Sequence, residues 1–193
     1  MKKINHEDLL SLEEYSKKRD EIRTHTMAHK EKRRLNIGEN AFLYFEDTTT
    51  MYYQVQEMLR IERLFDAEEI KQELDTYNPL IPDGTNWKAT FMLQYGDIPT
   101  RRAELGKLLD IEDKIWVEVE GCERIYGIAN EDLDRKDPEK TSSVHFMRFE
   151  LPGDTVLAVK MSAEIKFGIN HDNYRQEVVL PEKIRASLVE DLD

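Results

Sequence analysis

The sequence predicts an α+β fold with a mostly antiparallel sheet, made of several β-ribbons on which long N-terminal and central helices pack. Two observations support this class. Candidate strands follow one another across short turns, and helices interrupt them without regular β–α–β alternation. The glycine patterns of dinucleotide-binding and phosphate-binding loops are absent, so a doubly wound nucleotide-binding sheet has no support. The length of 193 residues fits one domain, residues 1–193.

The first part of the chain predicts a long helix followed by a strand. Ser11 and Glu14 have the spacing of a capping box, in which each side chain accepts a hydrogen bond from the other residue's backbone. A helix from about residue 12 to residue 35 is expected after it, ending at the Asn-Ile-Gly sequence of residues 36–38. The aromatic residues of 41–46 predict a strand.

The central part of the chain predicts a second long helix. Residues 51–55 can either complete a hairpin or begin this helix, and helix is the stronger prediction from about 54 to 76. The Asn-Pro pair at 78–79 ends it, because the residue before a proline avoids the α region. The Pro-Asp-Gly sequence at 82–84 is typical of a turn.

The second half of the chain predicts paired strands and short helices. Proline near the first turn marks two of these helices, and Gly121 marks a turn between two strands. A polar loop is expected at 130–140. The expected strands are 87–95, 113–120, 123–128, 141–151, 164–170 and 174–180, and the expected helices are 99–109, 153–161 and 181–192.

Charge and composition narrow the classes of partner. The net charge of -12 disfavours nucleic acids and anionic membranes, which bind clustered Lys and Arg. The basic run at 29–34 is interpreted as a solvated face or end of a helix. No apolar run approaches the ~20 residues of a membrane span, and the N-terminus lacks the apolar region of a signal peptide, so a cytoplasmic location is expected. Cys122 stands alone, which excludes an internal disulfide.

The helix predicted at 54–76 carries carboxylates among its apolar residues. Gln54, Met58 and Glu62 fall in one row on the face that holds Val55, and Glu57 lies at the edge of that face. A buried carboxylate requires a cation, a metal or several hydrogen-bond donors. Two interpretations follow: a structural ion pair with Arg or Lys from another element, or a metal-binding or proton-handling group.

A mixed histidine and carboxylate site is one hypothesis for these residues. Together with His29 and His145, the carboxylates Glu57 and Glu62 offer ligands suited to Fe, Mn or Zn. His25 lies four residues before His29, but the His-Glu-x-x-His pattern is absent. No Glu-x-x-His pair occurs either, which disfavours a ferritin-like di-metal site. Histidines that are satisfied within the core or exposed are the alternative.

Two further groups could carry chemistry. Ser143 and His145 lie two residues apart in a predicted strand and so on one face, but no nucleophile elbow is present and a hydrolase is disfavoured. Asp83 and Lys88 flank a glycine turn and could bind an anion or pair with each other. The simpler alternative for them is turn chemistry and a surface charge.

Four segments resemble a bacterial family of unknown function whose members have about this length. They are QEMLRIE at 56–62, YNPLIPDG at 77–84, KAT at 88–90 and KTSSVHFMRFEL at 140–151. The resemblance implies a single-domain cytoplasmic protein. It also implies a link to peroxide defence or electron transfer, because family members are encoded beside rubrerythrin-like proteins and iron–sulfur proteins similar to heterodisulfide reductase subunits. It supplies no catalytic assignment, and His25 does not match it. The matching polar residues are His29, Glu57, Arg60, Glu62, Asp83, Lys88 and His145.

Three hypotheses of function follow. The first is a non-catalytic accessory or binding protein of a redox or oxidative-stress system, which docks an iron-containing partner through its acidic surface. The second is a metal-binding protein or metal-dependent enzyme that uses His29, Glu57, Glu62 and His145. The third is a small-molecule pocket beside residues 83–90. The candidate binding residues are Arg60, Glu62, Asp83 and Lys88.

Overall fold

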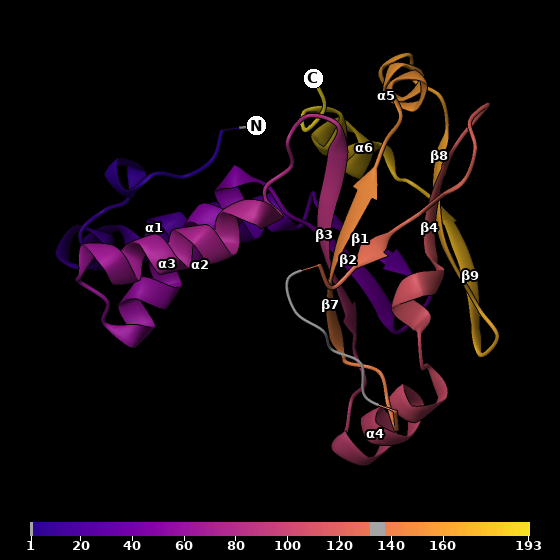
Figure 1. Cartoon of the computed structure of the whole chain (residues 1–193), viewed down its shortest axis with the longest axis horizontal. Helices are drawn as coiled ribbons and strands as arrows, with labels where there is room; N and C mark the ends of the chain where they lie inside the picture. The colour runs from indigo at the N-terminus through magenta and orange to yellow at the C-terminus, as the bar shows by residue number, and fades with distance from the viewer. Residues whose placement is uncertain (1, 132–137) are drawn as a thin grey trace.

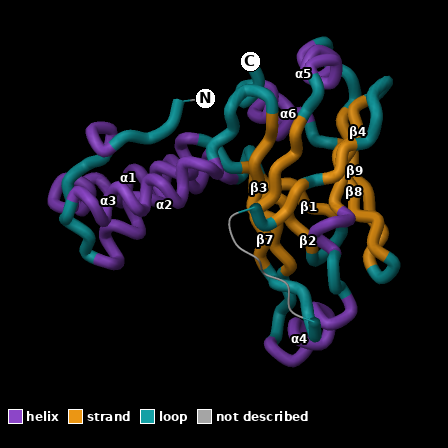
Figure 2. The backbone as a smooth tube through the Cα atoms, in the orientation of Figure 1, coloured by secondary structure: helices purple, strands orange, loops and turns teal. Residues whose placement is uncertain are grey.

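The computed structural model describes residues 2–131 and 138–193, and it confirms an α+β fold. A helical lobe of α1, α2 and α3 extends to one side of two antiparallel sheets (Figure 1). Helices α5 and α6 lie near one end of the sheets, and α4 lies near the other (Figure 2). The fold is thus a two-sheet body with a projecting lobe.

The elements have the following bounds. The α-helices are α1 (Leu12–Lys30), α2 (Thr48–Glu62), α3 (Ala67–Tyr77), α4 (Ile98–Lys107), α5 (Gly153–Lys160) and α6 (Glu182–Val189). The strands are β1 (Arg34–Ile37), β2 (Ala41–Phe45), β3 (Asn86–Leu93), β4 (Ile115–Val119), β5 (Ile125–Tyr126), β6 (Ile128–Ala129), β7 (Val144–Glu150), β8 (Ile165–His171) and β9 (Tyr174–Val179). Short 3-10 turns are η1 (His6–Asp8), η2 (Asn78–Leu80) and η3 (Ile111–Lys114).

The main core lies between the two sheets. Within the described residues, one sheet has the order β1-β2-β3-β7-β6 and the other β5-β4-β8-β9. Phe167 on β8 is the centre of an aromatic cluster: its ring centroid lies 5.3 Å from that of Phe45, 5.5 Å from that of Phe149 and 6.0 Å from that of Trp87. These three rings come from β2, β7 and β3 of the opposite sheet. Alternation along β3 and β7 places one set of side chains in this core and the other on the outer face.

The helical lobe has a hydrophobic cluster of its own, formed by Ile4, Met51, Val55, Leu59, Ile70, Leu74 and Ile81. Its central helix α2 begins at Thr48, because the Asp47 carboxylate caps the backbone N–H of Thr50 at 2.9 Å. Residues 51–55 are therefore helical, which decides between the two structures that the sequence left open.

Two predicted helices have different ends in the structure. The helix predicted at 54–76 is two helices, since Arg63 adopts a left-handed conformation (φ 55°) and Asp66 caps a new helix. The helix predicted at 12–35 ends at Lys30, and residues 34–37 form strand β1, which the sequence analysis missed. Pairing with β2 buries Leu35 and Ile37 in the main core, and this long-range pairing overrides the local helical pattern.

Most other elements are confirmed to within a few residues. The strand predicted at 123–128 is divided at Gly127 into β5 and β6, which belong to different sheets. The first residues of the strand predicted at 113–120 form η3 instead. Part of the loop predicted at 130–140 lies outside the described residues. Among the described helices, none combines the length and the apolar character that crossing a bilayer requires.

We expect Gly168→Ala to destabilise the four-stranded sheet. A Cβ at Gly168 would lie 2.2 Å from a ring carbon of Trp116, its partner on β4, and the buried indole has little room to shift. Overpacking of this kind costs about 1–3 kcal/mol. The free energy of unfolding from urea titration measures the effect. Gly96→Ala is the control, because no atom lies within 4 Å of its Cβ position. Equal stability of the two variants would contradict the expected clash.

Candidate functional site

The prediction that Glu62 faces the core is wrong. Glu62 is exposed at the end of α2. The neighbouring apolar residues Ile61 and Phe65 are 60% and 73% exposed. The buried face is rotated away from them and centres on Val55 and Leu59, with Gln56 as its buried polar residue. The Gln56 side chain bonds the backbone N–H and carbonyl of Leu10 and is thereby satisfied.

Glu57, rather than Glu62, is the carboxylate of α2 that forms an ion pair with another helix. It receives two hydrogen bonds from the guanidinium of Arg19 on α1, at 2.8 and 2.9 Å, and one from the Tyr15 hydroxyl at 2.8 Å. Arg60 also pairs with it at 3.1 Å. The Arg19 hydrogen bonds, followed by those of Arg60 and Tyr15, outweigh partial burial and lower the pKa of Glu57 to about 2. Arg19 and Glu57 thus form a structural ion pair that joins α1 to α2, and Arg60 adds a second cation from α2 itself.

His145 is fully buried and also has structural partners. Its Nε2 lies 3.0 Å from the Thr141 hydroxyl and 3.0 Å from the Ser142 carbonyl, and the Asn130 amide contacts its Nδ1 at 3.0 Å. Glu112 lies 3.8 Å from Nε2 and accepts a hydrogen bond from Thr141. The strand spacing suggested that Ser143 lies beside His145. In the structure the hydroxyl that contacts the imidazole belongs to Thr141.

The proposed metal ligands do not come together. His29 pairs with Asp47, Glu57 with Arg19, and Glu62 is exposed, while His145 faces the main core. Among the described residues, no group of three or more His, Cys, Asp or Glu side chains is arranged to hold a metal ion. These residues therefore offer no site for Fe, Mn or Zn in the described part of the chain.

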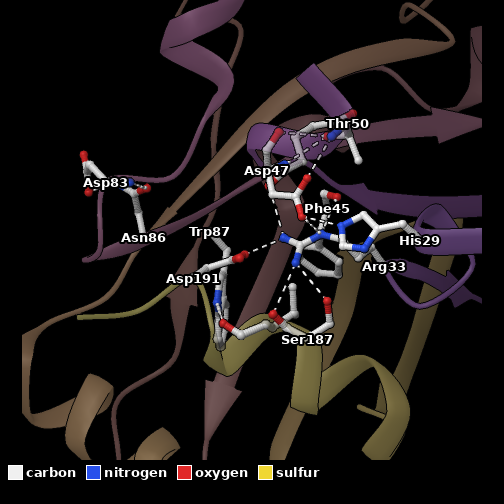
Figure 3. Close-up of polar contacts among 12 residues, drawn as sticks. His29, Arg33, Phe45, Asp47, Thr50, Asp83, Asn86, Trp87, Ser187 and Asp191 are labelled. Atoms are coloured by element: carbon white, nitrogen blue, oxygen red, sulfur yellow. Dashed lines mark hydrogen bonds and ion pairs between the residues drawn. The ribbon is translucent and has the colours of Figure 1, made fainter. Parts of the chain in front are cut away.

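Arg33 forms a buried polar cluster that the sequence analysis missed (Figure 3). The side chain is 2% exposed and lies between two carboxylates. Its Nη2 donates to Asp191 at 2.5 Å and its Nε lies 3.5 Å from Asp47. The guanidinium also donates to the carbonyls of Phe45, Glu46 and Ser187 and to the Ser187 hydroxyl. Arg33 belongs to the basic run at 29–34, and no local signal distinguishes it from the exposed members of that run.

His29 and Asp191 lie on opposite sides of this cluster. His29, at the end of α1, contacts Oδ2 of Asp47 at 2.5 Å, the same oxygen that lies near Arg33. On the other side, Oδ1 of Asp191 is buried without a hydrogen-bond partner among the described atoms. Burial, opposed by the charge and hydrogen bond of Arg33, raises the pKa of Asp191 to about 6. The cluster joins α1, the start of α2 and the segment after α6.

Asp83 shapes a turn. Its Oδ1 accepts hydrogen bonds from the backbone and hydroxyl of Thr85 and from the Asn86 amide at 2.8 Å (Figure 3). Lys88 follows on β3, where the chain pairs with β7. No ion pair joins Asp83 to Lys88 among the contacts of the described residues. The turn interpretation thus accounts for the hydrogen bonds of Asp83, and Lys88 must be considered separately.

Lys88 lines a pocket of about 420 Å³ between the helical lobe and the outer face of the five-stranded sheet. Leu80 of η2 and Phe146 of β7 contribute apolar wall, and Arg148 of β7 lies directly opposite Lys88 in the strand register. Lys88 is half-buried and forms no ion pair or side-chain hydrogen bond with a described residue. Burial, followed by the charge of Arg148, lowers the pKa of Lys88. A desolvated cation without a partner is an anchor for a ligand group.

The guanidinium N–H groups of Arg148 already have carboxylate partners. Its guanidinium binds Glu131 through two bonds of 2.8 Å and Glu150 through a third of 2.5 Å. These hydrogen bonds hold the pKa of Glu131 below its usual range. A ligand in this pocket would therefore meet Lys88 as the available basic group, beside an arginine whose hydrogen bonds go to two glutamates.

A larger depression of about 750 Å³ lies beside α4 and the turn between β8 and β9. Cations and carboxylates both line it, among them Lys107, Lys114 and Arg175 with Asp110, Asp113 and Asp172. This mixture favours neither sign of ligand charge, so the Lys88 pocket is the better defined candidate.

Comparison with known proteins establishes the family. The family model described as "Protein of unknown function (DUF3501)" matches residues 3–192. The chain belongs to this family. It is also 42% identical to a novel protein of unknown function from Burkholderia pseudomallei, whose crystal structure matches it with a TM-score of 0.94 over 100% of both chains. No curated protein matches the chain. The match establishes a family of unknown function, as the resemblance implied, and it supplies no activity.

We expect Asp191 to make the protein less stable as the pH rises. Because its pKa is about 6 in the folded chain and 3.8 ordinarily, the folded state favours the protonated acid. This stabilisation is complete below pH 3.8, declines as the pH rises and is lost above pH 6, a change of up to about 3 kcal/mol. The asparagine of the Asp191→Asn variant cannot titrate, so this contribution to stability does not change with pH in the variant. The free energy of unfolding of the variant minus that of the wild type should therefore increase as the pH rises from 3.8 to 6.

Chemical denaturation of both proteins at several pH values measures the difference. Glu190→Gln is the matched control, because Glu190 is the exposed neighbouring carboxylate. The stability difference between this control and the wild type should stay nearly constant over the same interval. A pH-independent difference for Asp191→Asn would show that Asp191 is not the titrating group.

Proposed function

We propose that this protein binds a small molecule in the pocket between its helical lobe and its five-stranded sheet, with Lys88 as the polar anchor. The observation that carries the proposal is a half-buried lysine, without a partner among the described residues, in a pocket of about 420 Å³. Burying a cation costs free energy unless an acceptor compensates it. A ligand with a carboxylate, phosphate or carbonyl group would provide that acceptor.

The walls of the pocket indicate the rest of the ligand. Leu80 and Phe146 present apolar surface, and Thr76 and Glu131 add polar groups. Binding pockets for small molecules commonly combine such apolar walls with a few polar groups that fix orientation. The proposed ligand therefore has an apolar body with an acceptor at one end. Of the sequence-based binding candidates, Lys88 has the central role, Asp83 shapes the preceding turn, and Arg60 and Glu62 lie on α2 outside the pocket lining.

We expect Lys88→Met to abolish most of the binding of small acceptor ligands while the fold is kept. Saturation-transfer NMR with benzoate, phenyl phosphate and acetophenone provides the measurement. Loss of a hydrogen bond to a charged group should weaken binding about 10-fold to 100-fold. Lys166→Met is the matched control, because Lys166 is a half-buried lysine on β8 that pairs with Glu164 at 3.3 Å. If none of the three probes binds the wild type, or if both variants bind equally, the proposal fails.

We also propose a role as an accessory protein of a redox or oxidative-stress system with an iron-containing partner. The net charge of -12 favours this second function, since a surplus of one sign steers a protein toward a partner of the opposite sign. The resemblance to a family encoded beside rubrerythrin-like and iron–sulfur proteins supports the nature of the partner. The two proposed functions are compatible, because the residues that line the pocket cover only a small part of the surface on which a partner could dock.

We expect this protein to co-purify from its native host with a redox protein that contains iron. Since the attraction is electrostatic, the complex should be recovered at low salt and lost as the salt concentration rises. Affinity purification at two salt concentrations, with iron analysis and mass spectrometry of the captured proteins, is the measurement. If the protein is recovered at low salt and no iron-containing protein is captured with it, the accessory role is contradicted.

A further inference from the structure

Lys88 and Arg148 are directly opposite each other on neighbouring antiparallel strands. The register of β3 and β7 pairs the two residues, and both side chains are on the outer face of the sheet. Side chains opposite each other in this way start from Cβ atoms about 4.5–5.5 Å apart, and like charges there repel. An arginine keeps its proton in proteins, whereas a lysine can lose its own. The repulsion therefore acts on Lys88.

Burial acts in the same direction. Partial removal of Lys88 from water disfavours its ammonium form, and this is the largest cause of its lowered pKa, ahead of Arg148. The nearby carboxylates Asp83, Glu131 and Glu150 oppose the shift without reversing it. At neutral pH a larger fraction of Lys88 is thus the free amine than of an exposed lysine. A desolvated lysine beside another cation is a recurrent form of activated nucleophile.

The neighbouring contacts argue against simple recognition of an anion by two cations. Arg148 is bound to Glu131 and Glu150, so its N–H groups are already engaged. The amine of Lys88 is therefore the reactive group that the pocket offers. The two glutamates lie beside it as carboxylates, which can accept and return protons.

We infer that Lys88 condenses with the carbonyl group of an aldehyde or ketone held in this pocket and forms an imine. The inference rests on the proposed binding function and assigns the chemical class of the ligand. The carbonyl carbon would face the Lys88 nitrogen, and the apolar remainder of the ligand would lie against Leu80 and Phe146.

The reaction balances without a further reactant. The nitrogen lone pair forms a bond to the carbonyl carbon, and the π-electron pair of the carbonyl moves to its oxygen. Glu131 or Glu150 relays the two protons from nitrogen to that oxygen, which leaves as water as the second carbon–nitrogen bond forms. One amine and one carbonyl compound give one imine and one water molecule, and nothing is oxidised or reduced.

Reductive trapping tests the inference. The full chain is incubated with benzaldehyde at pH 7 and treated with borohydride, and the benzylated lysines are located by peptide mass spectrometry. We expect Lys88 to be labelled faster than the exposed Lys160, because burial and the opposing Arg148 both favour the free amine of Lys88. Labelling of Lys88 should saturate with benzaldehyde concentration, and its advantage should shrink toward pH 10, where an ordinary lysine also offers free amine.

Arg148→Gln provides a second readout that a general loss of structure would not imitate. The variant removes the opposing cation and frees two glutamates to pair with Lys88. The trapping rate of Lys88 should therefore fall toward that of Lys160, while Lys160 itself reacts as before. Circular dichroism confirms that the variant is folded.

The outcomes separate the two proposals. Binding of acetophenone that depends on Lys88, together with labelling of Lys88 no faster than that of Lys160, would overturn the imine and keep the binding function. Absence of both binding and preferential labelling would overturn both. Preferential labelling that rises linearly with benzaldehyde, without saturation, would reveal only a reactive amine and would overturn the inferred carbonyl site.

Discussion

The buried guanidinium of Arg33 is the constraint on which the arrangement of the molecule depends. It follows α1, contacts Asp47 at the start of α2 and binds Asp191 and Ser187 from the C-terminal part of the chain. Removing an ion from water costs several kcal/mol, so such a charge is tolerated only where carboxylates and carbonyls surround it. Five hydrogen bonds engage the group. Since they come from separate segments, they form only when lobe and sheets have this relative position.

The candidate pocket is a consequence of that relative position. Its lining combines the end of α3 and η2 from the lobe with β3 and β7 from the sheet. Neither part alone encloses Lys88. The Arg33 cluster and the hydrophobic cluster of the lobe thus stabilise the two walls between which the proposed ligand binds. A change in the Arg33 cluster should therefore affect ligand binding through the position of the lobe, without contact with the ligand.

The polar groups inside this protein divide into two kinds. Glu57 and His145 are surrounded by donors and acceptors of the chain itself, and their contacts join helix to helix or strand to loop. Lys88 differs because the described residues provide it with no such partner. Buried polar groups are usually satisfied, so this difference is the physical reason to assign the site to Lys88 rather than to the histidines and glutamates of the metal hypothesis.

The sequence by itself determined the α+β class, most of the elements, the capping box of Ser11 and Glu14, and the turn at Asp83, because each follows from contacts a few residues apart. It also indicated the region of the pocket through Lys88. Only the tertiary structure decided that Glu57 rather than Glu62 is the paired carboxylate, since the buried face of α2 depends on where α1 packs. Likewise, Arg33 and Asp191 are 158 positions apart, and no local periodicity encodes a contact over that separation.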